Sequence, residues 1–161
     1  MANYTGADVI TTSDVLKYQP DAFDFGISTT ATETVNFLAQ TTNDILRQLR
    51  VEWWPVYKTN IFTDITVLNT AEMVNTKVNL DQFERAGVYL FLGRFLLPAL
   101  TKFRPETEKD RFERMQEYYM SQYNIEWRMI LEDGVEYDVD SDGTIISNER
   151  EPLHGFRRLT R

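Results

Sequence analysis

Residues 138–149 read DVDSDGTIISNE, with acids at positions one, three, five and twelve and glycine at position six. This is the spacing of the twelve-residue EF-hand loop, in which side-chain oxygens surround one cation and the glycine permits a sharp turn. The stretch therefore predicts a site for a structural Ca²⁺. Its ligands would be four carboxylates and one backbone carbonyl, from Asp138, Asp140, Asp142, Glu149 and Thr144.

A second interpretation of the same loop needs no ion. An EF-hand continues into an exit helix, which Pro152 and Gly155 disfavour, and Gly134 separates the loop from the helix before it. We therefore do not expect a sensor that opens a pair of helices. In this alternative the aspartates accept hydrogen bonds from their own backbone, with Tyr137 and Ile145 anchoring a hairpin, or they pair with arginines of the C-terminal segment.

The rest of the chain offers little catalytic chemistry. It has no cysteine and a single histidine, His154, which excludes thiolate chemistry and a histidine-rich metal centre. Glycine-rich phosphate loops, dinucleotide fingerprints and nucleophile elbows are missing from the sequence. Glu106, Glu108 and Asp110 fall in the first turn of an expected helix, where acids complement the helix dipole. We expect no enzymatic activity.

Composition limits the classes of partner. A chain of 161 residues suits one domain, and 13% aromatic residues indicate large anchors in a core or an interface. A net charge of −8 opposes non-specific binding to duplex DNA, because that binding comes from cations that displace counterions. The amino terminus lacks a basic start and an apolar stretch, so we expect no export. The longest apolar run is interrupted at Arg94, so we expect no membrane span.

Helical periodicity predicts a mainly α fold, a small bundle of three long helices at 33–53, 80–97 and 107–130. The second is apolar on most sides and should form the centre of the core, with Gly87 and Gly93 allowing another helix to approach closely. The stripe expected on the first helix comprises Val35, Leu38, Thr42, Ile45, Leu46, Leu49 and Trp53, with Pro55 as its stop. The stripe expected on the third comprises Phe112, Met115, Tyr119, Tyr123 and Trp127. The charged residues off the first stripe, expected to be solvated, are Arg47, Arg50 and Glu52.

Shorter elements complete the prediction. Ser13 should cap a short N-terminal helix ending near Tyr18, and Asn79 or Asp81 should cap the second long helix. The β-branched run 61–68 either pairs as a strand or packs as a loop. The expected organisation is a flexible arm at 1–12, a helical bundle at 13–131, an acidic EF-hand-like loop at 132–149 and an extended basic arm at 150–161.

The C-terminal arm, REPLHGFRRLTR, has too few apolar residues to fold alone, so its order must come from a partner. Truncation after Arg150 should abolish docking and leave thermal unfolding nearly unchanged. The arm residues expected to contact a partner are Leu153, Phe156, Arg157, Arg158 and Arg161.

Several segments in order resemble one known family. They are DVLKYQPDAFDF near the start, NLDQFERAGVYLFLGRFL, FERMQEYYMSQYNIEWRMIL, YDVDSDGTIISNE after a glycine, and a tail ending in arginine. Together they are similar to the head-to-tail connector, adaptor or head-completion, proteins of tailed bacteriophages. The resemblance implies a small helical bundle with an extended C-terminal arm.

The resemblance also implies a structural role in the virion neck, after assembly in the host cytoplasm. About a dozen copies would form a ring that contacts the portal protein and tail or neck proteins, and DNA would pass through it during ejection without sequence-specific binding. An acidic lumen suits this role, because it lets a polyanion slide. Two alternatives stay open: a soluble calcium-binding interaction module, and another neck or tail-completion protein with more sheet.

Overall fold

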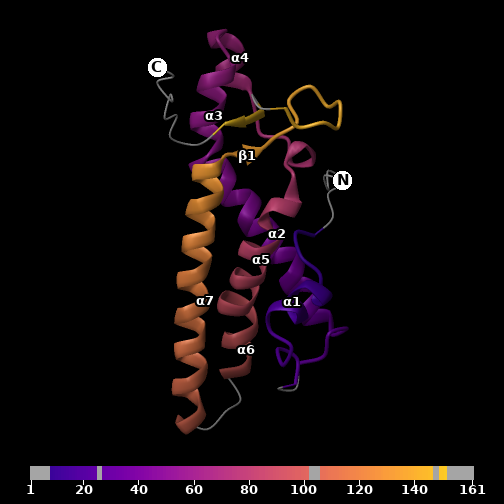
Figure 1. The fold of residues 1–161 in the computed structure, drawn as a ribbon, viewed down its shortest axis with the longest axis vertical. Coiled ribbons are helices and arrows are strands. Elements are labelled where there is room, and N and C mark those ends of the chain that lie inside the picture. Colours follow the sequence, from indigo (N-terminus) through magenta and orange to yellow (C-terminus); the bar gives the residue numbers. More distant parts are fainter. Residues whose placement is uncertain (1–7, 25–26, 102–105, 147–148, 152–161) are drawn as a thin grey trace, which may run out of the picture. The chain divides into compact units, whose positions relative to one another are not determined.

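The computed structural model describes residues 8–24, 27–101, 106–146 and 149–151, with the side chains of 101–110 and 151 left out (Figure 1). The described chain is mainly helical and confirms the predicted fold class, since its three longest helical stretches lie where the periodicity placed them. None of the helices in these ranges is both long enough and apolar enough to cross a membrane.

The described residues form two compact units. The helical unit contains residues 8–44 and 83–127, and the hairpin unit contains residues 45–82 and the described residues from 128 onward. Helices α2 (Thr32–Glu52) and α7 (Glu106–Asp133) contribute residues to both units.

The helical unit begins with α1 (Thr12–Tyr18). Its N-cap is Thr11 rather than the predicted Ser13, because Thr11 and Asp14 form a reciprocal capping box: each side chain accepts a hydrogen bond from the other's backbone N–H. Val15 is fully buried and anchors the helix. The signal for this start was the Thr11-x-x-Asp14 spacing.

The second long helix is one helical stretch in three parts: α5 (Glu84–Leu90), a π-helical segment η3 (Phe91–Leu96) and α6 (Leu97–Thr101). Residues 86–93 are all buried, which confirms that this stretch is central to its unit's core. At Gly93 a Cβ atom would meet Met120 Sδ at 2.9 Å and the Met120 backbone nitrogen at 3.2 Å. The predicted close approach of another helix is therefore confirmed there.

The stripes on α2 and α7 are confirmed with one exception. Val35 is 52% exposed, and the buried side chain in the first turn of α2 is that of Thr34 instead. The predicted stripe residues that are buried are Leu38, Thr42, Ile45, Leu46, Leu49, Trp53, Phe112, Tyr119, Tyr123 and Trp127. Met115 is half-buried, and the solvated face of α2 is confirmed because Arg47, Arg50 and Glu52 are exposed.

In the hairpin unit, the prediction of a strand or loop at 61–68 holds only for the short loop at 62–64. The rest of the run forms the end of α3 (Trp54–Ile61) and most of α4 (Ile65–Thr70). Asp64 caps α4 by accepting a hydrogen bond from Thr66 N at 2.8 Å, and this local cap outweighs the β-branched composition. Pro55 lies in the first turn of α3, directly after Trp54, where its missing N–H has no cost, and α2 already ends at Glu52.

Two 3₁₀ turns, η1 (Asn75–Lys77) and η2 (Leu80–Phe83), lead toward α5. Asn79 Oδ1 accepts a hydrogen bond from Asp81 N at 3.2 Å, so Asn79 caps the 3₁₀ turn before the helix rather than the helix itself. At the far end of α7, Gly134 has a φ of 99°, the left-handed conformation that ends a helix. Gly134 thus turns the chain from α7 into the hairpin.

The hairpin consists of β1 (Val135–Glu136) and β2 (Arg150–Glu151), paired antiparallel with Val135 opposite Glu151 and Glu136 opposite Arg150. Glu149 is followed at once by β2, so the described residues after the acidic loop form a strand, in agreement with the predicted lack of an exit helix.

Candidate functional site

The acidic loop starts from an aromatic cluster in the hairpin unit. The Tyr137 ring lies 5.7 Å from Trp53, 5.4 Å from Trp54 and 5.6 Å from Tyr57, measured between ring centroids. The Tyr137 hydroxyl accepts a hydrogen bond from Val74 N at 3.1 Å. Burial raises the pKa of Tyr137 above its ordinary value, although the Val74 N–H opposes the shift. Tyr137 is therefore the hairpin anchor that the sequence predicted, whereas the other predicted anchor, Ile145, is only half-buried.

Backbone hydrogen bonds fix both ends of the loop. Tyr137 N donates to Glu149 O at 3.1 Å, and Asp138 N donates to Lys77 O at 2.9 Å. Lys77 Nζ also donates to the carbonyl of Val139 inside the loop. The loop is thus tied to its own closing strand and to the segment around η1.

Two of the loop's acids are buried and bind the loop's own amides. Asp138 is 5% exposed and accepts from Ser141 N at 2.6 Å and Gly143 N at 3.0 Å. Glu149 is 4% exposed and accepts from Val139 N at 2.8 Å and Ile146 N at 3.1 Å. A carboxylate that satisfies two backbone donors in this way holds a loop closed.

The other two acids lie on the surface. Asp140 accepts from Asp142 N at 3.1 Å, and Asp142 accepts from Thr144 N at 2.7 Å. Ser141, with a φ of 65°, and Gly143, with a φ of 81°, make the sharp bends between them. The described loop is thus organised by its own backbone, which is the second of the two interpretations of the sequence.

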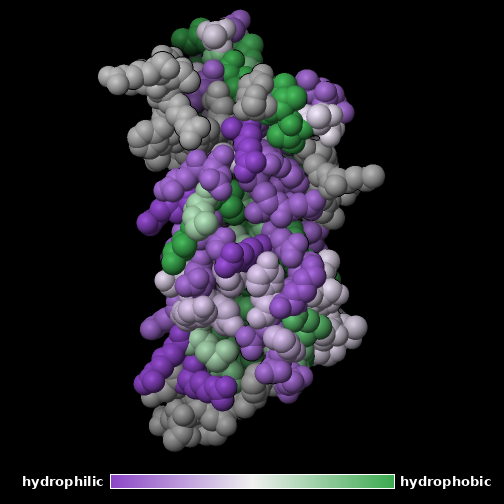
Figure 2. Space-filling view, viewed as in Figure 1, coloured by the Kyte–Doolittle hydropathy of each residue, from purple (hydrophilic) through white to green (hydrophobic). Residues whose placement is uncertain are grey.

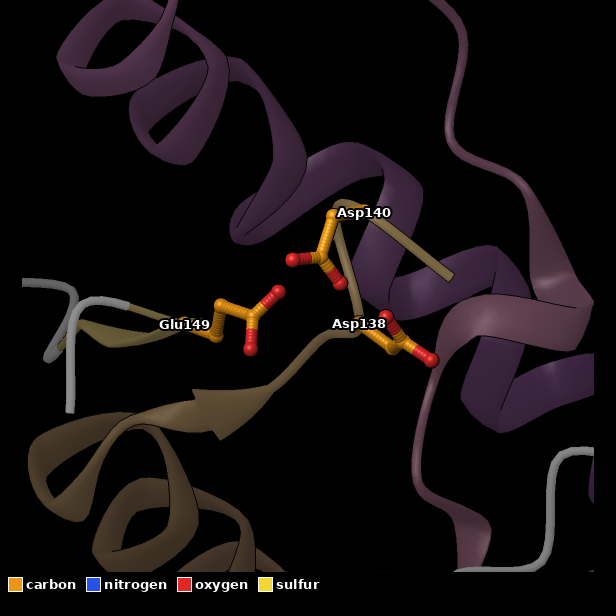
Figure 3. A group of neighbouring side chains, drawn as sticks. All are labelled: Asp138, Asp140 and Glu149. Atoms are coloured by element: carbon orange, nitrogen blue, oxygen red, sulfur yellow. The ribbon is translucent and has the colours of Figure 1, made fainter. Parts of the chain in front are cut away.

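The same arrangement also offers oxygen ligands for a cation. Asp138, Asp140 and Glu149 can each supply one carboxylate oxygen, all within 4.8 Å of one another (Figure 3). Ca²⁺ binds oxygens at about 2.3–2.6 Å, so oxygens on opposite sides of the ion stand about 5 Å apart, and a carboxylate has lone pairs left after accepting one hydrogen bond per oxygen. The three residues thus offer three of the roughly six to eight oxygens that Ca²⁺ takes. Asp142, a predicted ligand, is not in this group; the Thr144 N–H donates to Asp142, a hydrogen bond that does not involve the Thr144 carbonyl, which is the predicted ligand atom.

A polar network lies beneath the loop. Glu136 Oε2 accepts from Asn79 Nδ2 at 2.6 Å, and Glu136 Oε1 lies 3.4 Å from Arg150 Nη1. Gln82 joins the network by accepting from Glu136 N at 2.7 Å. The first arginine of the predicted basic arm therefore pairs with Glu136 and not with an aspartate of the loop.

Sequence reasoning missed a pocket of about 450 Å³ in the hairpin unit. Its walls come from the end of α2, from α3 and from the segment after α4. The residues that line it are Arg50, Trp54, Pro55, Lys58, Ala71, Glu72 and Met73. Arg50 was assigned to a solvated face, and the available signal was the cluster of aromatic residues and proline in WWP at 53–55 beside two cations.

The remaining predicted site residues, Leu153, Phe156, Arg157, Arg158 and Arg161, lie outside the described residues, as does His154. Comparison of the chain with models of protein families, with curated proteins and with solved structures found no match.

Proposed function

We propose that this protein is a structural virion component, the head-to-tail adaptor of a tailed bacteriophage, and that copies of it form a ring between portal and tail through which DNA passes. The resemblance of its segments motivates the proposal, and a mainly helical fold with three long helices suits it. A net charge of −8 suits a channel that must not retain DNA.

An uncovered apolar surface on the hairpin unit is the observation that carries this proposal. No side chain of α4 is buried, and Ile65 is 72% exposed and Val67 43% exposed. Val56 on α3 is also exposed, and Figure 2 shows hydrophobic residues gathered over α4. A helix with no buried side chain among the described residues is expected to bury its apolar residues against another molecule. An assembly protein needs such a surface.

The test is electron microscopy of the purified chain, alone and mixed with the portal protein encoded in the same genome. We expect ring-shaped particles, or chain bound in a layer on the portal ring. A chain that stays monomeric in both samples, or a genome that encodes no portal protein, would rule the adaptor out.

A second candidate function, a calcium-binding interaction module, is favoured by the oxygen group of Asp138, Asp140 and Glu149. Titration with Ca²⁺ in a calorimeter tests it directly. If Ca²⁺ binds, the thermal midpoint rises with its concentration, because a ligand of the folded state stabilises by about 2.7 kcal/mol at a hundred times its Kd. The Asp138→Asn variant should abolish the heat signal, and the Asp133→Asn variant, which changes an exposed acid at the end of α7, should retain it.

Treatment with a chelator distinguishes the three ways in which the loop could be held in place: by a cation, by arginines or by backbone amides. If a cation holds it, chelation should weaken ring assembly of the unmutated chain. If arginines of the C-terminal arm hold it, high salt should weaken assembly and chelation should not. If backbone amides alone hold it, neither treatment should change the loop.

A further inference from the structure

The pocket in the hairpin unit combines positive charge with an apolar floor. Trp54 and Met73 are buried, and the Trp54 indole is fixed because its Nε1 donates to Ala71 O at 3.2 Å. Arg50 and Lys58 line the same pocket from α2 and α3. Aromatic and aliphatic walls with two cations suit an occupant that presents carboxylates beside a short apolar side chain.

The pocket carries a positive charge on an acidic protein. Glu72 is the single acid among its lining residues. Arg50 Nη2 donates to the neutral Asn75 Oδ1 at 2.6 Å, and Lys58 forms no ion pair with any residue in the described ranges. Two cations against one acid leave a net charge of about +1 locally, on a chain whose net charge is −8.

The acidic loop of the same chain presents the complementary chemistry. Asp140 and Asp142 are exposed and, within the described residues, form no ion pair. Ile146, in the same loop, is 47% exposed. Because Asp138 and Glu149 already hold the loop's backbone, the loop loses little conformational entropy when it binds a partner.

The acidic loop begins beside α3, because Tyr137 packs against Trp54, but the rest of the loop projects away from that helix, on the other side of β1 (Figure 1). We propose that the pocket around Arg50 and Lys58 receives the acidic loop, residues 138–146, of a second copy of the chain. Such a contact joins two different surfaces, and its repetition from copy to copy forms a ring when the rotation between neighbouring copies closes. The inference rests on the proposed adaptor function, because it names the contact between neighbours in the ring.

Charge reversal on both sides tests the contact. The pocket variant carries Arg50→Glu and Lys58→Glu, and the loop variant carries Asp140→Lys and Asp142→Lys. Each variant alone places like charges together, so we expect its self-association, measured by analytical ultracentrifugation, to require a concentration at least about tenfold higher. The matched controls, Arg47→Glu on α2 and Glu132→Lys on α7, reverse exposed charges outside both surfaces and should associate normally.

Mixing the two variants makes the test specific. In an equal mixture the reversed pocket of one variant meets the reversed loop of the other, and the native pocket of the second meets the native loop of the first. Association should return in the mixture, and also in a chain carrying all four substitutions. A contact within one chain would be restored only by the four substitutions together and not by mixing.

Several results would overturn the inference. If the pocket variant associates as tightly as the unmutated chain, the pocket is not the receptor. If the loop variant loses the tryptophan fluorescence of the folded hairpin unit, it is misfolded, and the association of the pocket variant then tests the contact by itself. Rings that form normally from the pocket variant reject this contact and leave the adaptor proposal standing, whereas an unmutated chain that forms no ring, with or without portal, rejects both.

Discussion

The acidic loop contains two kinds of carboxylate that the sequence does not distinguish. Asp138 and Glu149 are buried and each accepts two backbone hydrogen bonds, whereas Asp140 and Asp142 are exposed and each accepts one. The buried pair therefore closes the loop, and the exposed pair faces outward, where it is available to a cation or a partner.

Replacing one acid of each kind should separate these roles. Asp138→Ala leaves two amides without their charged acceptor at a buried position, and we expect it to lower the free energy of unfolding by about 2–3 kcal/mol. Asp142→Ala removes one exposed hydrogen bond and should lower it by less than about 1 kcal/mol. Urea unfolding measures both. Equal losses for the two variants would contradict the division into closing and outward-facing acids.

The double substitution of Asp140 and Asp142 by alanine should weaken ring assembly and leave the fold in place. It removes the exposed charges and retains both closing acids. Light scattering reports the assembly, and far-ultraviolet circular dichroism checks the helices. Normal assembly of this variant would show that the exposed acids of the calcium-like loop have no role in assembly.

Sequence spacing identified the loop and its acceptor chemistry, but it did not identify which acids are buried. Burial of Asp138 depends on Lys77, sixty-one positions earlier, whose carbonyl accepts from Asp138 N. The pocket was missed for the same reason, because the path of α3 and α4, and not any local pattern, brings Arg50 and Met73 to the lining of one pocket. Local periodicity carries no information about such contacts between residues far apart in the sequence.

The sequence predicts a helix correctly where one face of that helix is buried, because the buried residues then recur with the helical period. The stripes of α2 and α7 were predictable because one face of each packs on the core. The helical part of residues 61–68 was not predictable, because α4 buries no side chain and therefore shows no buried stripe. The described feature that favours a helix there is the cap at Asp64. The π-helical segment η3 was not predicted either. A π-helix changes the spacing of buried residues, and an apolar run that is buried on most sides shows no such spacing in the sequence.

The contact between Gly93 and Met120 should limit what residue 93 tolerates. Gly93→Ala places a Cβ atom 2.9 Å from Met120 Sδ and 3.2 Å from a backbone nitrogen, so we expect a loss of about 1–3 kcal/mol from overpacking. Met120→Ala in the same chain should recover only the part due to the side chain. Thermal unfolding of the two single variants and the double variant measures the coupling. Strict additivity would show that the two residues do not meet.

Helix α1 should be sensitive to acid through its capping box. Burial raises the pKa of Asp14, but hydrogen bonds from Lys17 Nζ and Thr11 outweigh it, so the pKa lies below the ordinary 3.8. A lowered pKa in the folded state adds stability that is present above the unfolded value and is lost as the pH falls through the folded value. The unfolding free energy should therefore decrease below about pH 3.8, and Asp14→Asn should reduce that decrease. An unchanged pH profile in the variant would contradict this role.

For the assembled protein, β2 sets where the C-terminal arm can be removed. The predicted cut after Arg150 would delete Glu151, which pairs with Val135, so a cut after Glu151 is the cleaner experiment. We expect the shortened chain to lose binding to the portal and to keep its thermal midpoint, because a segment this poor in apolar residues adds little to the fold. Co-sedimentation measures the binding of the shortened chain to the portal, and calorimetry measures its thermal midpoint. A large fall in the midpoint would mean that the arm belongs to the fold.

The placement of the three tryptophans gives each unit its own optical signal. Trp53 and Trp54 lie in the hairpin unit beside Tyr137, whereas Trp127 lies in the helical unit beside Phe83. A Trp127→Phe variant would emit from the hairpin unit alone, and a variant with phenylalanine at 53 and 54 would emit from the helical unit alone. Emission spectra recorded during unfolding would then show whether the two units melt together or in turn, without any added label.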